Sequence, residues 1–92
     1  MKYVMFAKDM EQDMTHYVPI MFPDMLVHAM VASEMSRLLP GYEVVSAGHF
    51  NPAAISIGTI FCYGESETLG IPSDPMRDSR IIYYNNYGGS FQ

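Results

Sequence analysis

The hydrophobic pattern of the chain changes from short apolar runs to helical spacing and back. Residues 2–7 (KYVMFA) and 17–22 (YVPIMF) are short runs rich in aromatic and branched side chains, which is typical of strands. We expect the first strand to be buried on both faces. Pro19 cannot donate a ladder hydrogen bond, which favours a sheet edge for the second strand. The polar residues 8–16 predict a connecting loop, so the two strands should form an antiparallel hairpin.

Helical spacing follows from Leu26 to Leu39. Four apolar residues recur there at intervals of three and four, so they share one face: Val27, Val31, Met35 and Leu38. Phe22-Pro23-Asp24 ends the preceding strand, and Pro40-Gly41 ends the helix by removing a backbone donor and adding a flexible joint. This segment is the main helix of the predicted fold.

The third and fourth strands are predicted at 43–50 and 55–63, with a turn between them. An antiparallel hairpin centred on that turn places Glu43 opposite Cys62. In this register His49 lies about 20 Å from Cys62, so these two side chains should not meet within one chain.

The last third of the chain begins with a loop from Gly64 to Gly70. Ser73-Asp74-Pro75 then supplies a capping side chain and a proline at the first helical position, which predicts a short helix. Ile81 to Tyr84 prefers strand by propensity and leaves that choice open, and 85–92 is expected to be a loose tail. The predicted fold is a single α+β domain of order β-β-α-β-β-α, a four-stranded, mainly antiparallel sheet with one main helix packed on it.

The composition indicates a folded chain that association with further copies would stabilise. Hydrophobic residues make up 49% and charged residues 16%, which excludes a disordered chain. A domain this short buries only about 60–65% of its unfolded surface. We therefore expect a homo-oligomer.

Charge and cysteine content exclude several classes of partner. The net charge is −5, and the five Lys and Arg residues are scattered, so a nucleic-acid surface is not expected. A single cysteine, Cys62, excludes an internal disulfide and suits a reducing cytoplasm. No apolar run approaches the roughly 20 residues of a membrane helix, and no signal-peptide layout is present.

No catalytic or metal centre is predicted. A Cys-His nucleophile would need a histidine beside Cys62, and a structural, half-buried cysteine is the better interpretation. The three histidines, His16, His28 and His49, lack the spacing of a recognised metal site. We expect no enzyme activity and no cofactor, and His28, near the start of the helix, could equally cap or pack or bind a ligand.

The Gly64–Gly70 loop is the candidate ligand site. It offers two glycines, hydroxyl groups and free backbone N–H groups close to the start of the last helix, a combination that can hold an anion or a ribose. A solvated turn is the alternative interpretation. With one edge of the third strand and a basic residue of the last helix, the predicted ligand-binding residues are Ser46, His49, Gly64, Glu65, Ser66, Thr68 and Arg77.

Methionine is unusually abundant, with nine residues in the chain. Met is flexible and polarizable, so an excess can mark a surface that adapts to a partner. Met5, Met21 and Met35 suit the core. Four others lie in polar surroundings or off the helix stripe, and we expect them in a subunit interface: Met10, Met14, Met25 and Met30.

Short pieces of the chain resemble small, largely uncharacterised phage-encoded proteins. They are Met1 to Phe6, Ile20 to Asp24, Val45 to Gly48 and Tyr63 to Gly70. The resemblance implies a phage accessory protein in the host cytoplasm, with counter-defence as a leading role.

Two binding functions follow, and they differ in partner. The first is a non-enzymatic trap for a small nucleotide immune signal, with a pocket shared between subunits. The second is an inhibitor of a bacterial defence protein, of the anti-CRISPR type, that uses the Met-rich half or an acidic edge. A phage accessory protein without a ligand is the third possibility.

Overall fold

The centre of the fold is a four-stranded antiparallel sheet. A computed structural model describes the chain from Met1 to Gly88. The sheet has the order β2-β1-β3-β4. Its strands are β1 (Lys2–Asp9), β2 (Thr15–Phe22), β3 (Glu43–Phe50) and β4 (Cys62–Tyr63). The predicted β1–β2 hairpin is confirmed, with Met5 opposite Pro19. Pro19 lies in an edge strand, as expected for a residue without a backbone donor.

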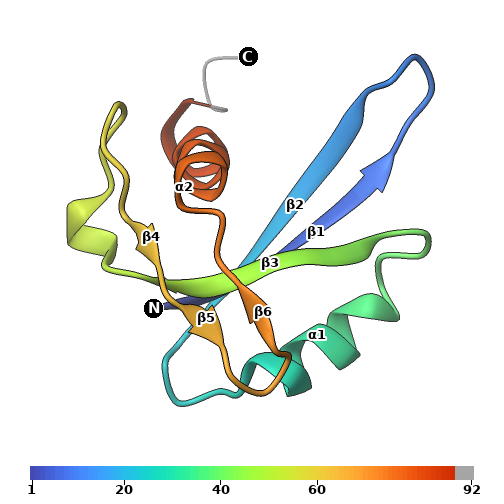
Figure 1. Ribbon diagram of the computed structural model, residues 1–92, viewed down its shortest axis with the longest axis horizontal. Helices are drawn as coiled ribbons and strands as arrows, with labels where there is room; N and C mark the ends of the chain where they lie inside the picture. Colours follow the sequence, from blue (N-terminus) through green and yellow to red (C-terminus); the bar gives the residue numbers. More distant parts are fainter. Residues whose placement is uncertain (89–92) are drawn as a thin grey trace.

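Alternation along β1 creates two cores, one on each face of the sheet. Tyr3 and Met5 face one side, where they pack with Ile82 of the helix α2 (Pro75–Tyr83). Val4 and Phe6 face the other side, where they pack with Ala32 of the helix α1 (His28–Ser36). All four β1 residues are fully buried, so the prediction of a strand buried on both faces is confirmed. Figure 1 shows the two helices on opposite sides of the strands.

The main helix is shorter than predicted. α1 spans His28–Ser36 instead of 26–39, because Leu26 N–H bonds to Pro23 O in a preceding turn and single turns follow after Ser36. Its inward face is formed by Val31, Ala32 and Met35. Val27 and Leu38 of the predicted apolar stripe are instead 40% and 70% exposed.

The prediction of a long fourth strand at 55–63 is wrong. Asn51 Oδ1 accepts from Ala53 N–H, and Pro52 starts a short 3-10 helix, η1 (Pro52–Ala54). Turns and irregular backbone follow as far as 61, so only two residues of β4 pair with β3. The register is therefore different: Phe50 lies opposite Cys62 and His49 opposite Tyr63.

The predicted Gly64–Gly70 loop forms a small hairpin. Its strands are β5 (Glu65–Ser66) and β6 (Ile71–Pro72), which pair with each other apart from the main sheet. The antiparallel four-stranded sheet and the main helix are confirmed, but the order β-β-α-β-β-α is not, because η1 and this hairpin intervene.

The last helix starts where predicted. Asp74 caps α2 by accepting from Arg77 N–H, and Pro75 is the first residue. Ile81 and Ile82 continue the helix despite their strand propensity, because Ile82 is fully buried against the sheet. The π-helical turn η2 (Tyr84–Gly88) follows, so the predicted loose tail is wrong for 85–88, and its remainder, 89–92, lies outside the described residues.

A polar network joins α2 to the sheet. The fully buried Asp78 carboxylate accepts from Tyr3 Oη at 2.5 Å, Asp74 N–H at 2.9 Å and Arg77 Nε at 3.2 Å. Arg77 also donates to Ser46 Oγ at 2.9 Å, and its guanidinium lies over the Tyr17 ring. Within Met1–Gly88, no helix has the length and apolar character needed to span a membrane.

Candidate functional site

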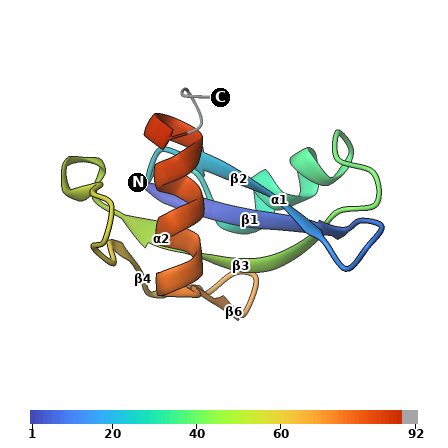
Figure 2. The same ribbon diagram turned by 90° about the horizontal axis from the view of Figure 1, so that it is seen from above.

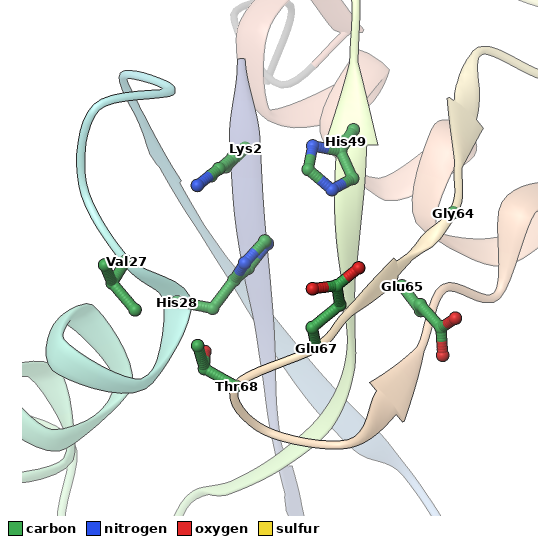
Figure 3. A pocket seen from close by; sticks show the side chains of 8 residues that line it. All are labelled: Lys2, Val27, His28, His49, Gly64, Glu65, Glu67 and Thr68. Atoms are coloured by element: carbon green, nitrogen blue, oxygen red, sulfur yellow. The ribbon is translucent and has the colours of Figure 1, made fainter.

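A cavity of about 400 Å³ opens on the α1 side of the sheet, beside the β5–β6 hairpin. Figure 3 shows its walls, which come from β1, β3, the start of α1 and the segment 64–68. The lining residues are Lys2, Val27, His28, His49, Gly64, Glu65, Glu67 and Thr68. Four separate parts of the chain therefore contribute polar side chains to one hollow.

Strand register brings the two basic residues of the sheet together. Lys2 and His49 are direct partners in the β1–β3 ladder, so their side chains emerge side by side on the α1 face. The His49 ring stacks on Tyr63 of β4 with a centroid separation of 5.8 Å and an interplanar angle of 27°. Lys2 Nζ donates to Leu26 O at 3.0 Å, which directs its charge towards the α1 side of the cavity.

His28 is a buried, neutral imidazole at the first position of α1. Only 4% of the residue is exposed, and its Nε2 lies 2.9 Å from Gly48 O. A carbonyl oxygen accepts hydrogen bonds, so Nε2 carries the proton and Nδ1 keeps its lone pair. Burial lowers the pKa of His28 below its ordinary value. Its ring meets the His49 ring edge to face at 5.3 Å.

Acidic residues lie opposite these bases. Figure 3 shows the Glu67 carboxylate directed towards the two imidazoles, whereas the Glu65 side chain points away from them. Lys2 and Glu67 thus give the cavity one cationic wall and one wall that accepts hydrogen bonds.

The turn between β5 and β6 also holds the start of α1. The N-cap residue Val27 has no side-chain acceptor, and Thr68 Oγ1 accepts from Ala29 N–H at 3.1 Å instead. Ser66 Oγ is buried and accepts from Leu69 N–H at 3.1 Å, which fixes the turn. Thr68 and Ser66 therefore use their hydroxyl groups to position the cavity wall.

The structure places the predicted ligand-binding residues in three locations. His49, Gly64, Glu65 and Thr68 line the cavity. Ser46 and Arg77 bond to each other on the α2 face of the sheet, and Ser66 lies inside the turn.

Sequence reasoning missed Lys2, Val27, His28 and Glu67 as cavity residues. The β1–β3 pairing is the signal that would have placed Lys2 beside His49, but these two residues are 47 positions apart in the sequence. Glu67 belongs to the predicted Gly64–Gly70 loop, but only the fold shows that its carboxylate is directed into the cavity.

Cys62 is adjacent in sequence to Tyr63, the ladder partner of His49, but its side chain lies on the opposite face of the sheet. The predicted separation of about 20 Å is wrong, because His49 pairs with Tyr63, the next residue after Cys62. Neighbouring residues of a strand point to opposite faces, and Cys62 belongs to the core under α2. Burial raises the pKa of the Cys62 thiol to about 11. In the described chain, no group of three His, Cys, Asp or Glu residues gathers in a way that would hold a metal ion.

The four methionines predicted for an interface are all exposed, in two places. Met10 and Met14 lie at the far tip of the β1–β2 hairpin and are 45% and 64% exposed. Met25 and Met30 lie before and in α1 and are 85% and 58% exposed. Met5 is buried, and Met21 and Met35 pack against the two cores as predicted.

Comparisons with protein-family models, with curated protein sequences and with solved structures found no match to this chain.

Proposed function

We propose that the protein is a non-enzymatic binding protein that captures a small nucleotide in the cavity between α1 and the β5–β6 hairpin. The observation that carries this proposal is the convergence of Lys2, His49 and Glu67, from three parts of the chain, on one hollow. A site that combines a cation, an aromatic surface and a carboxylate suits a ligand with an anionic group, a planar base and hydroxyl groups.

The chemistry of each wall matches one part of such a ligand. Lys2 would attract a phosphate as a point charge. The His49 ring, held by its stack on Tyr63, would contact the base. Glu67 would accept hydrogen bonds from ribose hydroxyls or from base N–H groups. A volume of about 400 Å³ lies within the usual range of roughly 300–1,000 Å³ for small-ligand sites.

Binding without chemistry is proposed for a physical reason. The cavity hydroxyl of Thr68 is occupied as a helix cap, and the buried Cys62 thiol is protonated at neutral pH and faces the other core. A nucleophile would need a free side chain beside a general base. The resemblance to phage accessory proteins adds a role in the host cytoplasm, where the ligand would be a nucleotide immune signal.

Native mass spectrometry tests the proposal directly. The protein is measured alone and with a mixture of cyclic and ADP-ribose-type nucleotides. We expect added mass in whole ligand steps, and a rise of at least tenfold in Kd for His49→Ala and for Lys2→Met.

Matched controls lie at the far end of β1 and β2. His16 bonds to Tyr42 and Lys8 lies over the same ring, so His16→Ala and Lys8→Met should leave Kd unchanged. A protein that ignores every nucleotide, or cavity variants that bind as well as the controls, would refute the site.

A second candidate is an inhibitor of a defence protein, favoured by an exposed apolar segment beside the cavity. Met25, Leu26, Val27 and Met30 are 38% to 85% exposed and nearly consecutive, which is typical of a protein contact. In this case purified defence complexes, tested one by one, would bind the protein without nucleotide. Met25→Ser with Met30→Ser would abolish that complex and leave nucleotide binding intact.

A further inference from the structure

A groove runs between the irregular segment 55–60 and the exposed side of α2. Figures 1 and 2 both show this segment standing beside the helix. Two hollows, of about 260 and 130 Å³, share Gly58, Thr59 and Arg80 as lining residues. Apolar side chains on both banks stay in contact with solvent: Ile57, Ile60 and Met76 are each more than half exposed.

Arg80 gives the groove a positive charge. Within Met1–Gly88, no aspartate or glutamate lines either hollow. Among the described residues, Arg37 and Arg77 each form ion pairs with carboxylates, whereas Arg80 forms none. An apolar groove with an unpaired arginine in a chain of net charge −5 favours an occupant that brings apolar side chains and a carboxylate.

The tip of the β1–β2 hairpin has this chemistry. Met10 and Met14 flank the tip and are joined by a backbone hydrogen bond, and Glu11 and Asp13 lie between them. All four residues are exposed. Gln12 and Asp13 have φ values of 65° and 60°, which is typical of a tight hairpin turn. Figure 1 shows the hairpin tip extending away from the two helices.

We propose that the hairpin tip of one copy of this chain docks in the Arg80 groove of a second copy. Met10 and Met14 would cover the apolar banks, and Glu11 would pair with Arg80. A two-fold arrangement would repeat the contact, with each copy supplying one tip and one groove, and so close a dimer. Edge-to-edge pairing of β2 is the competing mode, and Pro19 at the middle of that strand opposes it because proline cannot donate to a new ladder.

The test measures self-association of the full chain by sedimentation across a range of concentrations and salt. We expect a dimer, and a rise of at least tenfold in its Kd for Arg80→Glu and for Glu11→Arg. The double variant Arg80→Glu with Glu11→Arg should regain most of the lost affinity, because the pair is reversed and not removed. Arg37→Glu and Glu43→Arg are the matched controls, since both residues are exposed and outside the groove and the tip.

Each alternative result overturns the proposal. A chain that stays monomeric at high concentration has no such contact. A dimer that is unaffected by both single variants uses another surface. Loss of the dimer in Arg80→Glu but not in Glu11→Arg would give the groove a different occupant. Thermal unfolding of each variant by circular dichroism confirms that it is folded before its association is compared.

Discussion

The buried hydrogen bond between Tyr3 and Asp78 offers the sharpest test of the fold. Tyr3 is fully buried in β1, and its hydroxyl donates to a carboxylate of α2 at 2.5 Å, across 75 residues of sequence. Burial and the neighbouring Asp78 charge raise the pKa of Tyr3 well above its ordinary value, so the hydroxyl keeps its proton. The Tyr3→Phe variant removes only the donor.

The expected loss in free energy of unfolding for Tyr3→Phe depends on the packing and the hydrogen bonds that the variant keeps. The Phe ring fills the same space, and Asp78 keeps its bonds from Asp74 N–H and Arg77 Nε. No cavity forms, and the carboxylate is not left without partners. A hydrogen bond to a charged group contributes about 1.5–3 kcal/mol. In a domain of this size, a loss of about 2 kcal/mol lowers Tm by about 10 °C.

Urea unfolding followed by far-UV circular dichroism measures this loss. The midpoint should fall while the m value stays constant, because the surface exposed on unfolding does not change. Tyr63→Phe is the matched control, since Tyr63 is 58% exposed and should change the free energy of unfolding by less than about 0.5 kcal/mol. If Tyr3→Phe is equally mild, the hydrogen bond does not hold α2 to the sheet.

Three further predictions follow from buried groups. Because the pKa of His28 is lowered in the folded chain, the unfolded chain binds a proton at this residue more readily. The free energy of unfolding should therefore fall as the pH drops from 7 to 5. The His28→Gln variant retains a donor for Gly48 O and should show a smaller pH dependence in urea titrations. Cys62, with a pKa near 11 and a buried thiol, should react with a thiol reagent far more slowly than free cysteine until urea unfolds the chain. A Cβ at Gly48 would lie 2.5 Å from Tyr63 O, so Gly48→Ala should cost about 3 kcal/mol in the same titrations, and wild-type stability would refute this close approach.

Local patterns predicted the elements that are set by local chemistry. Strands β1, β2 and β3 follow from their apolar runs, and the start of α2 follows from Asp74 and Pro75. The prediction of a fourth strand at 55–63 was wrong because an apolar run does not by itself require a segment to pair with a neighbouring strand. Residues 55–60 carry strand-like side chains, yet Asn51 and Pro52 start a helical turn that removes them from the ladder.

The site was less predictable because it depends on contacts between distant segments. The sequence predicts only that His28 lies near the start of a helix, and the fold brings its ring into contact with His49. The sequence predicts only that Thr68 lies in a loop, and the fold shows that its hydroxyl accepts from Ala29 N–H of α1, 39 residues away. The separation of Ser46 from His49 was in principle predictable, since residues three apart in a strand point to opposite faces.

The sheet therefore lies between the Tyr3–Asp78 network and the cavity that we propose for binding, and Gly48 contacts residues on both sides of it. Its carbonyl holds the His28 ring on the cavity side, while its missing side chain lets Tyr63 approach closely, and the Tyr63 ring supports His49. Tyr3, Asp78 and Arg77 lie on the opposite face. Because the sheet lies between them, Tyr3→Phe should lower stability without changing the Kd of a cavity ligand, whereas Gly48→Ala should change both. A ligand whose affinity followed Tyr3→Phe instead would place its site on the α2 face, with Arg77 and Ser46.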